Sequence, residues 1–262
     1  MSKHEVPQTD FGKDFSLVHE AVVAGRAVGA DRKFWKALAK DPQLWRRVKA
    51  FVDNGKELFT PQHRAREIMG SENIFDPIWV DGDMWELTEA EMQLLERIPF
   101  PEDQLIASKD SHVLVALAPI TFAELHKHYG ARYFDSQFRP GRDDKDEFTK
   151  KRHSVGWHLV QKEALSGSMG ESLTDQQKLL RENELIPTAT LLAYTMVAYQ
   201  RKNRKRLFDG IYVRTSSVNS GALKIMLHNV PGVKGINSIE ICTSGGYARE
   251  DIGLAVETKP LW

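Results

Sequence analysis

The hydrophobic pattern of the chain changes its period near residue 206, and this change constrains the fold more than any other feature. Residues 189–204 carry apolar side chains at helical spacing, and the preceding Pro187-Thr188 pair is typical of a helix start. Beyond them, the β-branched run at residues 211–215 and the apolar run at residues 223–227 are typical of strands. The Asn-Ser-Gly turn at residues 219–221 joins these runs and predicts a β-hairpin.

Further segments complete the predicted C-terminal architecture. Residues 156–163 alternate as a strand does, and two more strands are expected at residues 236–242 and 252–257. A capping box, Thr174-x-x-Gln177, predicts a short helix before the long one. This order indicates an α+β fold with a mostly antiparallel C-terminal sheet packed by two helices. We expect the long helix to bury one side, made of Leu191, Leu192, Thr195, Met196 and Tyr199.

The N-terminal region, residues 1–137, is predicted to be mainly helical with one buried strand. Apolar spacing and end signals predict helices at residues 15–29, 34–40, 41–55 and 60–69. The last two are expected to start with a capping side chain and a proline, Asp41-Pro42 and Thr60-Pro61. Basic residues such as Arg46 and Lys49 also allow a helix-turn-helix, although a small helical subdomain with a solvated face is the simpler interpretation.

Two more capping boxes flank the predicted strand of this region. Thr88-x-x-Glu91 predicts a helix that reaches Ile98, and Thr121-x-x-Glu124 predicts a helix that ends at Gly130. Between them, the apolar run His112–Pro119 predicts a buried strand.

A highly charged segment follows at residues 138–153. It holds ten charged residues, one proline and one glycine, which is typical of a solvated connector. The sequence therefore predicts a linker between the N-terminal region and a C-terminal domain at residues 154–262. A docking loop is the alternative interpretation. Its acidic residues lack the glycine and ligand spacing of a calcium loop, so no metal is expected there.

Composition excludes several classes of protein. The 36 basic and 36 acidic residues balance, so the whole chain has no positive field to attract nucleic acid or membrane. One cysteine, Cys242, excludes an internal disulfide and a cysteine-rich metal cage. The longest apolar runs are too short for a bilayer-spanning helix, and the polar N-terminus does not match a secretory signal. We therefore expect a soluble, cytoplasmic protein without a membrane partner.

About 100 residues from Gly156 onward resemble a family of uncharacterised bacterial proteins that recur in metagenomic genomes. The matching strings are GWHLVQKE, the polar loop before TDQQKLL, ENELIPTATLLAY and LFDGIYVRTSS. The resemblance implies a coherent C-terminal domain and supplies no mechanism.

Basic and hydroxyl side chains gather in two places of the predicted C-terminal domain. Arg214 and Thr215, with Ser216 and Ser217, lie where a strand ends, and guanidinium and hydroxyl groups suit a carboxylate or phosphate. The end of the long helix carries Arg201, Lys202, Arg204 and Lys205, which is more positive charge than helix capping requires. Both groups are candidates for binding an anionic partner such as nucleic acid. The alternatives are a polar turn and a solvated helix end.

Signals for catalysis and cofactors are weaker. Glu124 and His128 share a helix face but lack a third ligand, so no metal site is expected. Ser216 is a candidate nucleophile only if a base such as His158 lies beside it, and its flanks do not form G-x-S-x-G. The glycine-rich Thr243–Tyr247 lacks a phosphate-loop pattern. No cofactor is therefore expected.

These observations favour a non-catalytic binding or assembly module with an anionic partner. The alternative is an enzyme acting on a phosphate-bearing or nucleic-acid substrate, with Arg214 as anion clamp and His158 as acid or base. A third hypothesis, an accessory protein of a phage or mobile element, has no direct support in the sequence. The enzyme hypothesis requires His158, Arg214 and Ser216 to line one concave pocket.

Overall fold

The computed structural model describes residues 22–23, 26, 31–40, 59–76, 87–130, 133–134, 147–230 and 238–260. The chain divides into two compact units, Met1–Lys56 with Trp262, and Glu57–Leu261. In the first unit, α2 (Arg32–Lys40) confirms the helix predicted at residues 34–40. The helix predicted at residues 41–55 and its helix-turn-helix alternative lie outside the described residues. So does the helix predicted at residues 15–29, apart from residues 22, 23 and 26, which are helical.

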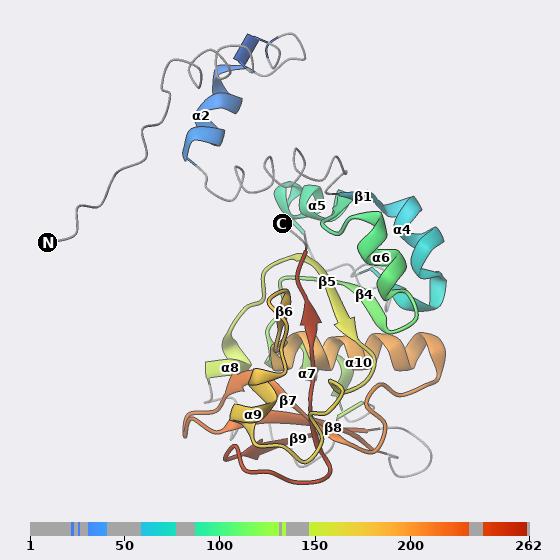
Figure 1. The fold of residues 1–262 in the computed structure, drawn as a ribbon, viewed down its shortest axis with the longest axis vertical. Helices are drawn as coiled ribbons and strands as arrows, with labels where there is room; N and C mark the ends of the chain where they lie inside the picture. The colour runs from blue at the N-terminus through green and yellow to red at the C-terminus, as the bar shows by residue number, and fades with distance from the viewer. Residues whose placement is uncertain are drawn as a thin grey trace, which may run out of the picture. The chain divides into compact units, whose positions relative to one another are not determined.

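Two mixed sheets form the framework of the second unit (Figure 1). The larger has the order β2 (Ile74–Phe75), β4 (His112–Leu117), β5 (Gly156–Gln161), β11 (Glu257–Thr258) and β6 (Glu184–Leu185). The smaller has the order β10 (Ile252–Leu254), β7 (Tyr212–Val218), β8 (Lys224–Val230) and β9 (Ser238–Ser244). Neighbouring strands are antiparallel except for the parallel pairs β2–β4 and β10–β7. A separate pair joins β1 (Thr60–Pro61) to β3 (Arg97–Ile98).

The long helix α10 (Ala189–Asn203) lies between these two sheets and contacts β4 on one side and β7 and β8 on the other (Figure 1). Every residue from Ala189 to Ala198 is buried as a result. The predicted helix is confirmed, but the expected single buried side is wrong. A helix packed by sheets on two sides buries nearly its whole circumference, so apolar residues appear all round it.

A second apolar cluster covers the opposite face of the larger sheet. Three helices supply it from outside the sheet: α4 (Gln62–Met69), α5 (Glu89–Glu96) and α6 (Glu102–Ser108). In β5, Trp157 and Leu159 face this cluster, whereas Val160 faces the core around α10. The alternation predicted for this strand is therefore confirmed, with both faces of the sheet covered by helices.

The α+β class is confirmed, but a helical N-terminal part followed by one C-terminal sheet is wrong. Helices and strands interleave, because β2 and β4 from the N-terminal half join strands from the C-terminal half. β4 and β5 pair along their whole length across the charged segment at residues 138–153. The described end of that segment forms a short helix, α8 (Glu147–Lys150). The strand predicted at residues 252–257 becomes β10 and β11, which belong to different sheets.

Local signals set most helix ends correctly. The capping boxes that start α5 and α7 (Phe122–Tyr129) are both formed, and α7 ends before Gly130 as predicted. The capping box predicted at Thr174-x-x-Gln177 is wrong. The N-cap of α9 (Leu173–Lys178) is Ser172, whose hydroxyl accepts from the Asp175 amide. Thr60 does not cap α4 either, because its hydroxyl donates to the Phe100 carbonyl at 2.6 Å.

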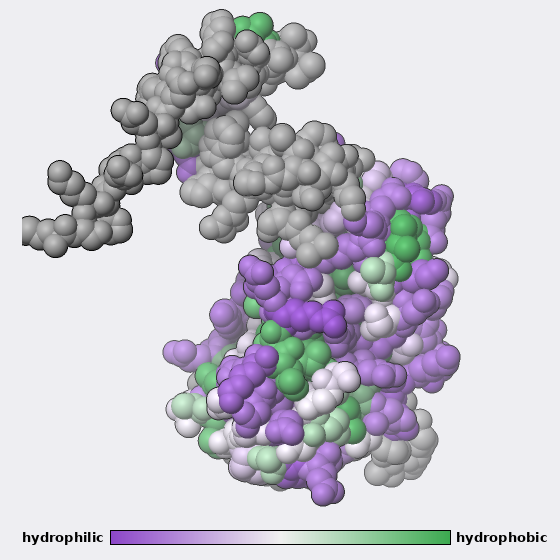
Figure 2. Space-filling model, in the orientation of Figure 1, coloured by the Kyte–Doolittle hydropathy of each residue, from purple (hydrophilic) through white to green (hydrophobic). Residues whose placement is uncertain are grey.

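The predicted β7–β8 hairpin is confirmed, with Tyr212 paired to His228 and a register shift between Arg214 and Val218. No helix among the described residues is long and apolar enough to cross a membrane. In the view of Figure 2, hydrophilic residues cover most of the described surface, and a small apolar area lies between β6 and α9.

Candidate anion-binding pocket

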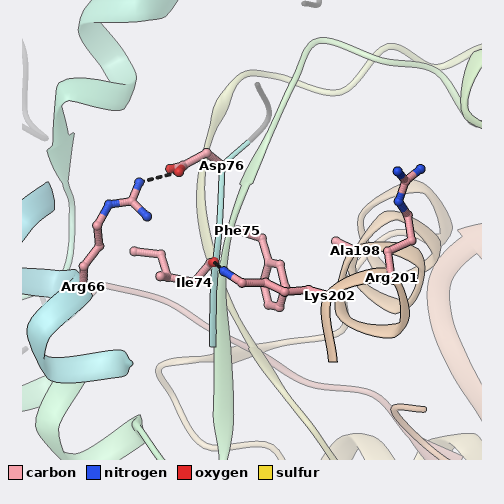
Figure 3. A pocket seen from close by; sticks show the side chains of 7 residues that line it. All are labelled: Arg66, Ile74, Phe75, Asp76, Ala198, Arg201 and Lys202. Carbon is pink, nitrogen blue, oxygen red and sulfur yellow. Dashed lines mark hydrogen bonds and ion pairs between the residues drawn. The ribbon is translucent and has the colours of Figure 1, made fainter. Parts of the chain in front are cut away.

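A cavity of about 630 Å³ opens beside the C-terminal end of α10. Its described lining consists of Arg66, Ile74, Phe75, Asp76, Ala198, Arg201 and Lys202 (Figure 3). Arg66 comes from α4, and the three α10 residues come from its last two turns. Between these helices, β2 supplies the apolar floor with Ile74 and Phe75, and Asp76 follows the strand. Arg66 and Arg201 stand on opposite sides of the cavity, and Lys202 crosses between them (Figure 3).

The charges of this lining are unbalanced. Three cations face one carboxylate, and the Arg66 guanidinium donates to Asp76. The Lys202 ammonium donates to the Ile74 carbonyl at 3.2 Å and lies 5.3 Å from the centre of the Phe75 ring. Burial, and then the charge of Arg66, lowers the pKa of Lys202. An anionic ligand would relieve this crowding of positive charge.

Aromatic rings hold Arg201 at the edge of the cavity. Its guanidinium carbon lies 5.6 Å from the ring centre of Tyr129 and 6.0 Å from that of Tyr133. These rings stabilise the charge of the guanidinium through cation–π contacts and fix its position.

Tyr194 lies one helical turn before Ala198, on the same side of α10 as the cavity. Its side chain is fully buried, and its hydroxyl has no hydrogen-bond partner among the described residues. Burial, and then the charge of Asp76, raises the pKa of Tyr194. The hydroxyl is therefore neutral at pH 7, and no described residue accepts its proton.

Only part of the predicted basic helix end belongs to this cavity. Arg201 and Lys202 line it, whereas Arg204 and Lys205 are exposed and do not. Arg204 instead ends α10 in a left-handed conformation, with φ of 56°.

The other predicted anion site is not at the surface. Arg214 is fully buried, and its guanidinium donates to Gln176 Oε1 at 2.6 Å, to the Glu171 carbonyl at 3.1 Å and to the Tyr247 carbonyl. Burial lowers the pKa of Arg214. The expectation that this guanidinium is presented at the rim of the sheet is therefore wrong. The start of α9 and the loop after β9 cover it, and no sequence pattern indicated that packing.

The remaining predicted site residues are also dispersed. Thr215 is buried, and its hydroxyl donates to the Ile225 carbonyl at 2.8 Å. Ser216 is exposed on β7, whereas His158 lies on β5 of the other sheet, with Nδ1 2.6 Å from Glu257 Oε1. Neither cavity found among the described residues is lined by His158, Arg214 or Ser216.

Metal and thiol chemistry receive no support within the described residues. They contain no group of three His, Cys, Asp or Glu side chains placed to hold a metal ion. Cys242 is half-buried, and burial, followed by the charge of Glu240, raises its pKa to about 12, so the thiol stays protonated near neutral pH.

Sequence reasoning missed Arg66, Phe75 and Asp76. Arg66 and Arg201 are far apart in the sequence, and only the packing of α4 and α10 around β2 brings them together. The one local signal was an apolar pair, Ile74-Phe75, followed by an aspartate.

No known protein family, curated protein or solved structure matches the chain. The resemblance from Gly156 onward stays a prediction.

Proposed function

We propose that the pocket beside α10 is a non-catalytic binding site for a small phosphate-bearing ligand. The observation that carries the proposal is that Arg66, Arg201 and Lys202 all line one cavity whose described lining includes a single carboxylate. Each guanidinium group can bind phosphate oxygens through two parallel N–H donors, and the Lys202 ammonium adds a point charge.

The size and lining of the pocket indicate a ligand larger than inorganic phosphate. Its volume of about 630 Å³ falls within the range of small-molecule sites. Ile74, Phe75 and Ala198 add apolar surface between the cations. An organic phosphate would place its charged group beside one of these cations and its carbon body on the apolar floor.

The composition of the lining favours binding over catalysis. Its described residues include no serine, threonine, cysteine or histidine. The carboxylate present, Asp76, is already paired with Arg66. A nucleophile and a separate base, which most group-transfer reactions need, are therefore not supplied by this part of the lining.

Calorimetric titration with pyrophosphate, AMP and adenosine tests the proposal. We expect pyrophosphate and AMP to bind and adenosine to bind much more weakly. Arg201→Gln with Lys202→Gln should weaken AMP binding by about tenfold or more per cation, because each charge-assisted contact contributes roughly 1.5–3 kcal/mol. Arg66→Gln provides a second variant on another helix.

The matched control is Arg204→Gln with Lys205→Gln, which removes the same charge from the same basic run outside the pocket. We expect this control to bind AMP as the native protein does, with a native unfolding curve for every variant. Equal weakening in both double variants, or no binding of either phosphate, would contradict the proposal.

A polynucleotide is the second candidate, because exposed Arg204 and Lys205 extend the basic surface beyond the pocket. In that case a single-stranded oligonucleotide should bind more tightly than AMP, with an affinity that falls steeply with salt. The control variant would then lose affinity as well, which separates this candidate from the first.

A further inference from the structure

A second cavity, of about 830 Å³, lies at the other end of the larger sheet's central strands. The end of α6, the start of β4, the end of β5 and the β6 and β11 region line it. Four carboxylates line it, from Asp103, Asp110, Glu163 and Glu184, against two cations, Lys162 and Arg181. With neutral histidine, the described lining has a net charge of −2, so its ligands are expected to differ in class from those of the basic pocket.

Three side chains form a chain of hydrogen-bonding groups in the wall of this cavity. Ser111 Oγ lies 2.8 Å from His112 Nδ1, and His112 Nε2 lies 3.1 Å from Thr258 Oγ1. Ser111 is exposed, whereas His112 and Thr258 are buried. The Ser111 hydroxyl can therefore reach a ligand, while Thr258 contacts the imidazole of His112 on its buried side.

His112 is neutral at pH 7, so one of its ring nitrogens can accept a hydrogen bond. Burial, and then the charge of Lys162, lowers its pKa to about 4, so the ring is neutral at pH 7. When Nε2–H donates to Thr258 Oγ1, Nδ1 carries the lone pair and accepts from Ser111. Thr258 then orients the ring from the side opposite Ser111, whose hydroxyl also lies 3.5 Å from the Ser108 carbonyl as an alternative acceptor.

A donor for the developing negative charge lies in the same wall. The Lys162 ammonium lines the cavity and donates to the carbonyl of Asp110, the residue before Ser111, at 2.9 Å. An ammonium has three donors, so it retains others for a carbonyl oxygen of a bound molecule.

We propose that Ser111 is the nucleophile of an esterase site whose substrates are neutral or cationic polar esters. Ser111 Oγ attacks the ester carbonyl carbon, and its proton passes to His112 Nδ1. The tetrahedral intermediate expels the alcohol, which takes that proton as it leaves. Water then attacks the acyl-serine, with His112 as base, and releases the acid and free Ser111.

Labelling with an alkyl fluorophosphonate and hydrolysis of p-nitrophenyl acetate test the assignment. The native protein should form one covalent adduct, located at Ser111 by peptide mass spectrometry. Ser111→Ala should lose the adduct and about 100-fold or more of kcat/KM. His112→Gln should lower both while leaving the unfolding curve cooperative.

The matched control is Ser216→Ala, because Ser216 is also exposed but lines neither cavity. We expect it to label and to hydrolyse the ester as the native protein does. No adduct, an adduct at another residue, or hydrolysis that survives Ser111→Ala would overturn the proposal.

Substrate charge provides an independent readout. Acetylthiocholine should be hydrolysed with a higher kcat/KM than a succinate monoester of p-nitrophenol, because the lining is negative. The reverse order would overturn the assigned substrate class. Pyrophosphate, the probe for the basic pocket, should leave ester hydrolysis unchanged. The proposed esterase site and the proposed phosphate site can therefore be tested independently.

Discussion

At the scale of one residue, the burial of Arg214 gives its charge a structural role. Its guanidinium is fully buried, and it donates to neutral oxygens: the side-chain carbonyl of Gln176 and the backbone carbonyls of Glu171 and Tyr247. A buried cation of this kind joins segments that are distant in the sequence, since the acceptors come from α9 and from two loops. Its removal leaves all of these oxygens without their donor.

We therefore expect Arg214→Met to lower the free energy of unfolding by roughly 3 kcal/mol. Urea unfolding followed by circular dichroism measures this change. Arg152→Met is the control, because Arg152 is exposed and its nearest carboxylate oxygen, on Glu124, lies 3.4 Å away. An exposed pair contributes at most about 1 kcal/mol. Equal losses in the two variants would show that Arg214 has no special structural role.

His112 gives a prediction for the pH dependence of stability. Its pKa in the folded protein, about 4, lies below the ordinary value of 6.5. The unfolded chain therefore binds more protons between these values, and stability falls as the pH is lowered through this window. Between pH 7.5 and pH 5 this one group should cost about 2 kcal/mol. Over the same pH range, the free energy of unfolding of the His112→Gln variant should fall by about 2 kcal/mol less than that of the native protein. The same dependence of this free energy on pH in both proteins would refute the prediction.

At the scale of one element, the start of α10 depends on two side chains. Thr188 Oγ1 accepts from the Leu191 amide at 3.2 Å, as a local N-cap does. Ser217 Oγ, from β7, accepts from the Ala189 amide at 3.0 Å. The sequence indicates the first cap, whereas the second requires β7 to lie beside the helix start.

Thr188→Ala and Ser217→Ala should each destabilise the protein by about 1 kcal/mol, because each leaves a helix amide without its acceptor. Thermal unfolding would measure both. Ser216→Ala, next to Ser217 but exposed, should leave the melting temperature unchanged. A Ser217→Ala protein as stable as this control would mean that water replaces the cap.

At the scale of the whole molecule, strands from both halves of the second unit build its larger sheet. β4 pairs with β5 over six residues, from His112↔Gln161 to Leu117↔Gly156. The core around α10 also takes side chains from β4 and from β8. Both apolar clusters lie within Glu57–Leu261.

We expect a chain of residues 57–262 to unfold in one cooperative transition in urea. A chain of residues 154–262, which is the domain predicted from the sequence, should not fold, because β5 loses its partner β4 and α10 loses its contact with β4. Circular dichroism and the slope of the urea transition distinguish these outcomes. Cooperative folding of residues 154–262 alone would contradict this view of the unit.

The sequence by itself determined the elements whose signals are local. The capping boxes of α5 and α7, the buried strand β4, the β7–β8 hairpin and the existence of α10 all follow from residues a few positions apart. The same local signals indicated Arg201 and Lys202, because a run of charge at a helix end is visible in the chain.

Only the tertiary structure decided how these elements combine. It placed β4 beside β5, buried Arg214, and brought Arg66 to Arg201 and His112 to Thr258. These contacts join residues separated by up to 146 positions, and they exist because apolar faces of the sheets must be covered by helices. Periodicity shows that a segment has an apolar face, but it does not say which other segment will cover that face.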